Sequence, residues 1–412
     1  MTRTKVLVIT PQYAPDFGPS APIYTALCED LQKFDYDVTV ITGFPHYNSL
    51  QAQPQTSRKF YHEEILNGVR ILRTYIYAVL KSVLWQRLLY HATYNISATV
   101  ATLQAKKPDI VLADAPTLWS GLPLLVTAIL PRVPFIYIVH DIYPDVLVRL
   151  GVITSPVLVN MIGRIEHFYY DRSAQISVLS DGFRENLMQK GVSQNKITVI
   201  PACVDVEFIH PLLKVNDLCK KWRLEGKNVV LYAGNIGFSQ GLEIMLDAAQ
   251  LLIDHSNIVF VLVGEGAAKS TLESMAEDMH LSNVLFFSFQ PREDVPLVYA
   301  LADVCLVSLR RNIVAESVPS KTYSIMASGR PIIATVHGDT EIAQLIQRSR
   351  CGLRVEPENP AALAQAIIYF YTNASVRVEM GKNGRDYVVE HYSRRVASEK
   401  YFHLIQSIVC RE

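Results

Sequence analysis

Short runs of β-branched residues alternate with amphipathic helical stretches along the chain, and this pattern occurs twice. Such alternation is typical of a parallel sheet whose strands are joined by crossover helices. The sequence therefore predicts an α/β protein with two doubly wound, Rossmann-like domains that face a cleft. The expected strands are 5–10, 38–42, 110–113, 135–140, 175–179 and 197–200 in the first half, and 229–233, 258–263, 284–287, 304–307 and 332–334 in the second.

The chain is long enough for two domains, because domains usually have about 100 to 200 residues and this chain has 412. Prolines and a charged stretch interrupt the alternation between Pro201 and Trp222, which predicts a linker with its hinge near Asp205. We therefore expect three parts: a first domain over 1–205, a second over 206–385, and a C-terminal helix over 386–412 that packs back toward the first domain.

The composition excludes several classes of protein. Basic and acidic side chains number 39 each, so no net charge attracts nucleic acid. With 50% hydrophobic and 19% charged residues, the chain is neither disordered nor fibrous. The six cysteines are scattered without the spacing of metal ligands, so we expect reduced, structural cysteines and no bound metal.

The start of the chain and its apolar stretches indicate a cytoplasmic protein without a membrane span. Residues 1–10 run straight into an expected strand and lack the pattern of a signal peptide. The longest apolar stretch, 118–130, falls short of the roughly 20 residues that a spanning helix needs.

One window differs in charge from the rest of the chain. Residues 58–107 contain eight basic and two acidic side chains. Within it, residues 74–103 contain no acid, two cations and the aromatic residues Tyr75, Tyr77, Trp85, Tyr90 and Tyr94. This composition suits a helix on a membrane surface, but it suits a core helix that lines a cleft equally well.

The loops that follow the expected strands are the places to look for a ligand, because open parallel sheets bind ligands beyond the carboxyl ends of their strands. After the first strand, Gly18 lies just ahead of a helix, an arrangement that suits an anion or forms a plain turn. After a later strand come His140, Asp141 and Asp145. A histidine there can bond a sugar hydroxyl or a developing charge, although a structural loop histidine is the alternative.

The most informative segment lies late in the second half. Ser320 fits the start of a helix, whose first N–H groups attract anions beside Lys321. Together with Arg310 and Arg311, this lysine could hold two phosphates, while Glu316 accepts hydrogen bonds from a polyol. An anion joined to a polyol suggests a nucleotide sugar, whereas a solvated basic loop is the alternative.

Two glycine turns follow strands of the second half and resemble phosphate-binding loops. The first contains Gly234, Asn235, Gly237 and Gln240, and the second begins at Gly264. Neither completes a P-loop or a dinucleotide fingerprint, so each alone is weak support for a phosphate site.

Taken together, these motifs resemble those of retaining GT-B glycosyltransferases of family 4, of the type that makes colanic acid and exopolysaccharides. The resemblance runs nearly end to end and rests on the segments 139–141, 180–182, 199–205, 232–237, 263–266 and 316–331. It implies a nucleotide-diphosphate sugar donor on the second domain and a glycan or polyprenyl-linked acceptor on the first. It also implies hexosyl or N-acetylhexosaminyl transfer with retention and without a metal, in the cytoplasm or at the inner membrane face.

The resemblance also implies roles for single residues. Glu316 matches the glutamate that contacts the donor sugar, and His140 matches the active-site histidine of the first domain. With Lys321 these are the predicted catalytic residues. The predicted donor-binding residues are Gly18, Gly234, Asn235, Gly237, Gln240, Gly264, Arg310, Arg311, Ser320 and Ser324.

The chain departs from the family pattern at three positions. The second glutamate of the family motif, expected to bind ribose, is Ser324 here. The arginine and lysine that usually clamp the phosphates are Asn235 and Gln240, both neutral. We therefore expect Lys321, with Arg310 or Arg311, to neutralise the diphosphate.

Two other functions fit the same layout. A non-hydrolysing nucleotide-sugar epimerase shares the two domains but needs acid and base carboxylates that face the sugar. A non-catalytic protein that binds a sugar nucleotide would use the cleft without turnover.

Overall fold

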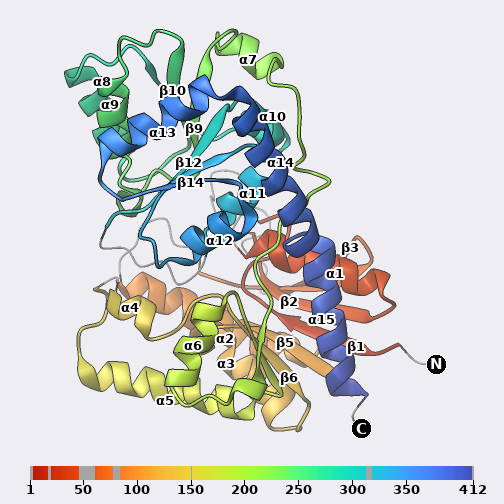
Figure 1. Cartoon of the computed structure of the whole chain (residues 1–412). Helices are drawn as coiled ribbons and strands as arrows, with labels where there is room; N and C mark the ends of the chain where they lie inside the picture. The colour runs from red at the N-terminus through yellow and green to blue at the C-terminus, as the bar shows by residue number, and fades with distance from the viewer. Residues whose placement is uncertain are drawn as a thin grey trace. The chain divides into compact units, whose positions relative to one another are not determined.

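The chain forms two compact units (Figure 1). The first comprises Met1–Ala202 and Ala397–Glu412, and the second comprises Cys203–Val396. The computed structural model describes residues 3–16, 20–45, 61–77, 84–149, 151–311 and 318–410. Each unit is an α/β layer structure around a mainly parallel sheet, so the predicted fold class is confirmed.

The first unit contains an eight-stranded sheet in the order β3-β4-β2-β1-β5-β6-β7-β8, in which only β3 is antiparallel to its neighbour. Its strands are β1 (Lys5–Ile9), β2 (Asp37–Gly43), β3 (Tyr61–Leu66), β4 (Val69–Thr74), β5 (Ile110–Asp114), β6 (Phe135–Val139), β7 (Gln175–Val178) and β8 (Ile197–Val199). Its helices are α1 (Ala21–Lys33), α2 (Leu84–Thr102), α3 (Thr117–Leu124) with its π-helical continuation η1 (Leu125–Ile129), α4 (Asp145–Arg149), α5 (Pro156–Arg172), α6 (Asp181–Gln189) and most of α15 (Arg394–Val409).

Helices cover both faces of this sheet. Alternate strand residues form a core with α2, α3, η1, α5 and α6 on one face. On the other face α15 packs beside α1, because Ser398 donates a 2.8 Å hydrogen bond to Asp30 and the Phe34 and Phe402 rings lie 4.7 Å apart. The C-terminal helix therefore packs on the first unit, as the sequence predicts.

The second unit contains an all-parallel sheet in the order β11-β10-β9-β12-β13-β14. Its strands are β9 (Asn228–Ala233), β10 (Ile258–Val263), β11 (Val284–Phe287), β12 (Val304–Ser308), β13 (Ile332–Thr335) and β14 (Gly352–Val355). Its helices are α7 (Asp217–Lys221), α8 (Glu243–Leu251), α9 (Lys269–Asp278), α10 (Val295–Ala300), α11 (Ser320–Ala327), α12 (Glu341–Ser349), α13 (Pro360–Thr372) and α14 (Ala374–His391).

The second sheet is buried on both faces, as expected of parallel strands between helix layers. All six side chains of β10 are buried, so this strand is a continuous apolar run rather than an alternating one. Helices α8, α9 and α13 share one core with the sheet. Helix α14 packs closely on the end of α11, where a Cβ at Gly381 would meet the Gly329 carbonyl oxygen at 2.2 Å.

The two stretches of chain at the border of the second unit are bonded to each other. The Val204 N–H donates to the Tyr392 carbonyl at 3.0 Å, and the Arg394 N–H donates to the Val204 carbonyl at 3.0 Å. This pairing interrupts the helical segment at residues 392–393. The predicted C-terminal helix over 386–412 therefore falls on two helices: α14 belongs to the second unit, and α15 packs on the first.

The structure contains strands that the sequence analysis did not predict. Strands β3 and β4 form a hairpin whose turn residues, Asn67 and Gly68, both have positive φ. The window from Thr74 to Leu103 is therefore not one helix, because β4 ends at Thr74 and α2 begins at Leu84. Tyr94 is fully buried in the core. The short edge strand β14 was also missed, because its residues are polar as well as apolar.

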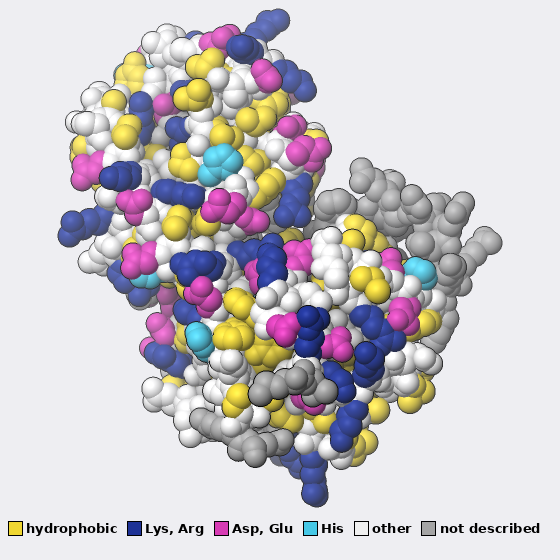
Figure 2. Space-filling model, turned by 90° about the vertical axis from the view of Figure 1, so that its right-hand side faces the viewer, with side chains coloured by type: hydrophobic (Ala, Val, Ile, Leu, Met, Phe, Trp, Pro, Cys, Tyr) yellow, Lys and Arg dark blue, Asp and Glu magenta, His cyan; other side chains and the backbone are white. Residues whose placement is uncertain are grey.

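Three features that the composition led us to examine can be seen in the described residues: the surface charges, the cysteines and the lengths of the apolar helices. Acidic and basic side chains are interspersed over the face drawn in Figure 2. All six cysteine thiols are free, and four of them are buried. Among the helices of the described residues, none combines the length and the apolar character that crossing a membrane requires.

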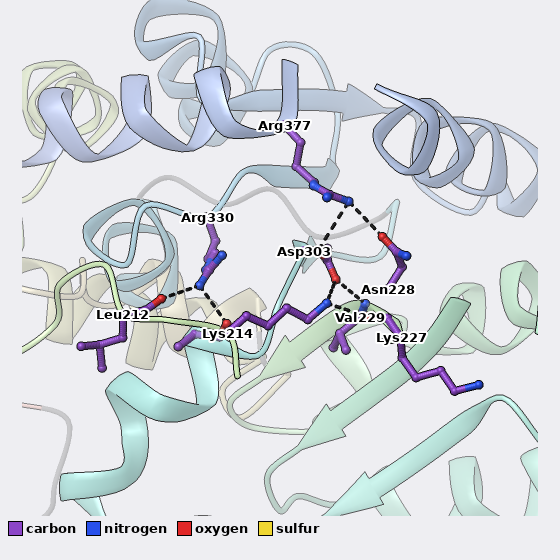
Figure 3. Close-up of polar contacts among 9 residues, drawn as sticks. Leu212, Lys214, Lys227, Asn228, Val229, Asp303, Arg330 and Arg377 are labelled. Carbon is purple, nitrogen blue, oxygen red and sulfur yellow. Dashed lines mark hydrogen bonds and ion pairs between the residues drawn. The ribbon is translucent and has the colours of Figure 1, made fainter. Parts of the chain in front are cut away.

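A cluster of charged side chains lies at the edge of the second sheet that is opposite to the edge where a ligand is expected. Asp303, just before β12, pairs with Lys214 and with Arg377 of α14, the latter at 3.4 Å. Its carboxylate also accepts a 2.8 Å hydrogen bond from the Val229 N–H. Figure 3 shows Lys214 and Arg377 converging on this carboxylate, while Arg330 donates to the Leu212 carbonyl. Asp303 thus ties the linker and α14 to the sheet.

Replacing Asp303 with Asn should lower the free energy of unfolding by about 2–4 kcal/mol, because two partly buried cations lose their carboxylate. Urea unfolding of the whole chain measures this change. Asp278→Asn, at an exposed position of α9, is the matched control and should change the free energy by less than about 0.5 kcal/mol. Equal unfolding curves for the two variants would contradict the role assigned to Asp303.

Candidate active site

The predicted phosphate loops of the second unit lie at the carboxyl ends of β9 and β10 and contact each other through backbone atoms. The Ile236 N–H donates to the Glu265 carbonyl at 2.8 Å, and the Ala268 N–H donates to the Ile236 carbonyl at 3.0 Å. A Cβ at Gly264 would lie 1.9 Å from the Gly234 carbonyl oxygen. Glycine is therefore needed at 264 for the loops to approach this closely.

Lys321 reaches into these loops from the first turn of α11. Its ammonium donates to the Tyr232 hydroxyl at 2.6 Å and to Gln240 Oε1 at 3.1 Å. The same ammonium lies 4.1 Å from the centre of the Tyr232 ring, a cation–π distance. A Cβ at Gly234 would come within 3.2 Å of it. The structure thus brings together Lys321, Gln240 and Gly234, three of the predicted residues.

The ammonium of Lys321 is largely desolvated, and its neighbours among the described residues do not neutralise it. Burial lowers the pKa of Lys321 to about 8, because desolvation disfavours the ammonium form. Among the described residues, no carboxylate forms an ion pair with it. The site therefore holds a partly desolvated cation beside the N–H groups at the start of a helix, and both favour an anion.

Tyr232 positions the ammonium and was not predicted as a site residue. Its hydroxyl accepts from Lys321 and donates to the Asn235 carbonyl at 2.6 Å. Burial raises the pKa of Tyr232, so the hydroxyl stays protonated and can donate. The signal available in the sequence was a tyrosine at the end of a strand, two residues before the glycine turn.

The two predicted arginines are both engaged by carboxylates. Arg310 pairs with Glu243 of α8 at 2.5 Å and donates to the Phe238 carbonyl at 2.6 Å. Arg311 lies 3.5 Å from Glu358 and donates to the Pro357 carbonyl at 2.9 Å. Of the three predicted cations, Lys321 is thus the one that has no carboxylate partner among the described residues.

The remaining residues predicted to bind the donor differ in their exposure and in what they contact. Ser320 is exposed at the first residue of α11, and Asn235 is exposed on the loop after β9. Ser324 is half-buried on α11 and forms a hydrogen bond with the buried Tyr299. Gly237 lies against the Asn235 side chain. Gly18 and Glu316 lie outside the described residues.

In the first unit, His140 follows β6 and faces a buried carboxylate. Its Nδ1 lies 3.4 Å from Oδ1 of Asp114, whose side chain is fully buried. The other carboxylate oxygen accepts a 3.2 Å hydrogen bond from the Thr10 hydroxyl. The ring of Tyr24 lies 5.6 Å from that of His140. Asp114 thus favours a proton on Nδ1 and leaves Nε2 as the other ring nitrogen for a ligand.

Sequence analysis missed Asp114, although its position at the carboxyl end of a strand beside that of His140 was a usable signal. Asp145, named with His140 as part of one motif, is occupied elsewhere: it pairs with Lys190 at 2.8 Å and accepts from Asn186 at 3.1 Å. Among the described residues, no group of three His, Cys, Asp or Glu side chains has an arrangement that could hold a metal ion.

Comparisons with known proteins bear on both units. A family model of the Glycosyl transferase 4-like domain matches residues 21–203, and a model of Glycosyl transferases group 1 matches residues 216–387. The chain is 26% identical over 380 residues to WcaI of Escherichia coli (strain K12), which is described as a colanic acid biosynthesis glycosyl transferase; the match covers 88% of this chain and 91% of WcaI.

Solved structures show the same fold. Sucrose-phosphate synthase from Thermosynechococcus elongatus matches with a TM-score of 0.74 and 18% identity over 100% of both chains. Anabaena HepE, solved in complex with UDP-glucose, matches with a TM-score of 0.70 and 14% identity over 98% of this chain and 100% of its own. Because the two family models match both units and the solved relatives share their architecture, the chain belongs to the glycosyltransferases of family 4, which have the GT-B fold.

Proposed function

We propose that this glycosyltransferase moves a hexosyl or N-acetylhexosaminyl group from a nucleotide-diphosphate sugar to a glycan or polyprenyl-linked glycan, with retention of the anomeric configuration, in polysaccharide biosynthesis. The bond from the anomeric carbon to a diphosphate oxygen breaks, a bond to an acceptor hydroxyl oxygen forms on the same face, and the proton of that hydroxyl passes to the departing diphosphate. The name of the relative WcaI supports a polysaccharide product, and the UDP-glucose bound by HepE supports a nucleotide-sugar donor.

The observation that carries the proposal is the desolvated ammonium of Lys321 at the start of α11, which no carboxylate of the described residues neutralises. The departing nucleoside diphosphate gains negative charge as the bond breaks. A cation and helix N–H groups that are already in place stabilise this charge without further reorganisation. In this chain Lys321 takes over from the clamp residues of the family that are replaced by Asn235 and Gln240, and no metal is required.

We assign the donor to the second unit and the acceptor to the first. The loops after β9 and β10 and the first turn of α11 hold the diphosphate, and Glu316 holds the donor sugar. His140, oriented by Asp114, meets the reacting sugar or the acceptor through Nε2. Asp114 is a positioning residue, since it is fully buried behind His140.

The function is tested by screening nucleotide sugars for a rise in melting temperature and then measuring nucleoside diphosphate release with lipid-linked and free glycan acceptors. We expect release to depend on the acceptor, and NMR of the product to show the anomeric configuration of the donor. Tight donor binding without turnover would favour a binding protein instead. Conversion of the donor sugar without an acceptor would favour an epimerase.

Replacing Lys321 with Met should lower kcat by about 10²–10³, the usual effect of removing one preorganised group that stabilises transition-state charge. The same variant should raise the free energy of unfolding at pH 7 by about 1–3 kcal/mol, because the folded protein no longer holds a desolvated ammonium. Steady-state kinetics and urea unfolding measure the two changes. Lys382→Met, at an exposed position of α14, should change neither quantity.

The pH dependence provides a second check on Lys321. The cation is lost as the pH rises through its pKa of about 8, so kcat/KM for the donor should fall above that pH. Because the unfolded lysine titrates at about 10.4, the unfolded chain binds more protons between these values and stability should rise with pH there. Lys321→Arg, which stays charged, should have lower activity but no such decline in kcat/KM. The same decline in the Arg variant would assign it to another group.

Replacing Asp114 with Asn should lower kcat by about 10- to 100-fold with little change in the donor KM, because the neutral amide no longer favours the Nδ1–H tautomer of His140. Nitrogen-15 NMR of the imidazole reports this tautomer directly. Adding Asp114→Asn to a His140→Gln variant should cause no further loss. Asp145→Asn is the control and should keep near wild-type turnover, since Asp145 is bonded to Lys190.

A further inference from the structure

The second unit has a cavity beside the last strand of its sheet. The cavity is lined by α12, β14 and α14, all labelled in Figure 1, and has a volume of about 500 Å³. Cavities that hold small molecules have volumes in this range. β14 ends the strand order, so no other described strand covers its outer side. The lining contains none of the residues predicted to bind the donor, and the cavity is therefore a candidate site for a second ligand.

Two glycines contribute no side chain to the lining. Gly338 follows β13 and Gly352 begins β14, and both line the cavity. A Cβ at Gly352 would lie 2.0 Å from the Ile332 carbonyl oxygen of β13. The close approach of β13 and β14 therefore requires a residue without a side chain at this point of the lining.

The two helices contribute apolar side chains to the walls of the cavity. Ala343 and Ile346 come from α12, and Val376 and Met380 come from α14. Residues three or four positions apart lie on the same side of a helix, so each helix places a short apolar strip along the cavity. These walls favour a ligand that has an apolar body.

A cation and an anion line the same cavity without pairing with each other. Arg350 follows the last turn of α12, and Glu379 belongs to α14. Both residues are exposed, and among the described residues neither side chain has an ion-pair partner. The third charged residue of the lining, Arg354, is paired with Glu356 at 2.6 Å. The cavity therefore offers a ligand one positive and one negative charge.

The backbone of Arg350 has a conformation that favours glycine. Its φ is 50° and its ψ is 36°, in the left-handed region where glycine is the commonest residue at the end of a helix. The Asn383 side chain donates to the Arg350 carbonyl at 3.4 Å, but a glycine would accept the same bond. Arginine thus costs stability here, and strain of this kind beside a cavity points to a role for the side chain.

We propose that this cavity binds a small zwitterion with an apolar body, either a free amino acid or a short peptide. The ligand's carboxylate pairs with Arg350 and its ammonium pairs with Glu379, while its apolar side chain lies against the wall that contains Met380. A sugar phosphate fits less well, because it has neither a cation for Glu379 nor an apolar body. The inference concerns a site apart from the donor site and does not depend on the proposed reaction.

Methionine labelled with carbon-13 in its methyl group reports on the cavity itself, because Met380 lines it and Met380→Leu assigns its NMR signal. We expect L-leucine to shift this signal with a Kd of about 1 mM, the scale for a ligand of about nine non-hydrogen atoms. N-acetyl-leucine lacks the ammonium and leucinamide lacks the carboxylate, so each should bind at least about fivefold more weakly. Leucyl-leucine separates the two sources: tighter binding than leucine assigns the cavity to peptides, and weaker binding assigns it to free amino acids.

Two variants test the charges. Arg350→Gly should weaken leucine binding at least about fivefold and remove the preference for leucine over leucinamide. The same variant should unfold at an equal or higher urea concentration, because glycine suits the left-handed conformation, so the loss of binding would not reflect a loss of folding. Glu379→Gln should remove the preference for leucine over N-acetyl-leucine.

Matched controls make the same changes outside the cavity. Arg223 of the second unit also has a positive φ, 55°, and Glu390 is exposed on α14; neither lines the cavity. Arg223→Gly and Glu390→Gln should bind leucine as the unchanged chain does. The proposal would be overturned if no probe shifted the Met380 signal up to about 20 mM. Equal affinities for leucine, N-acetyl-leucine and leucinamide, or unchanged leucine binding by Arg350→Gly, would also overturn it.

Discussion

The desolvated ammonium of Lys321 is the constraint on which the site depends. Removing a cation from water costs free energy, which is why burial lowers the pKa of Lys321 to about 8. A tyrosine hydroxyl, an amide oxygen and the face of an aromatic ring surround the ammonium and partly offset this free-energy cost. Among the described residues, no carboxylate neutralises the charge. The positive potential therefore remains available for an anionic ligand.

The position of Lys321 is fixed by contacts distant from the ligand edge. Helix α14 packs so closely on the end of α11 that Gly381 cannot carry a side chain. Arg385 of α14 also donates to the Ala327 carbonyl at the end of α11 and to the Val206 carbonyl in the linker. At the far edge of the sheet Asp303 holds α14 through Arg377. The cation thus extends from a helix that rigid neighbours hold in place, as precise charge stabilisation requires.

The sequence predicted the sheets well and the site in part. Buried parallel strands such as β10 are continuous apolar runs, and periodicity finds them. Strands β3 and β4 were missed because residues 58–107 were interpreted from their charge and aromatic content alone. The Asn67–Gly68 pair is nevertheless a strong hairpin signal. Arg310 looked available as a cation because sequence does not show that a distant residue, Glu243, lies beside it. Asp114 was missed although it comes at the end of a predicted strand, because the sequence alone does not show that this strand pairs with the one that precedes His140.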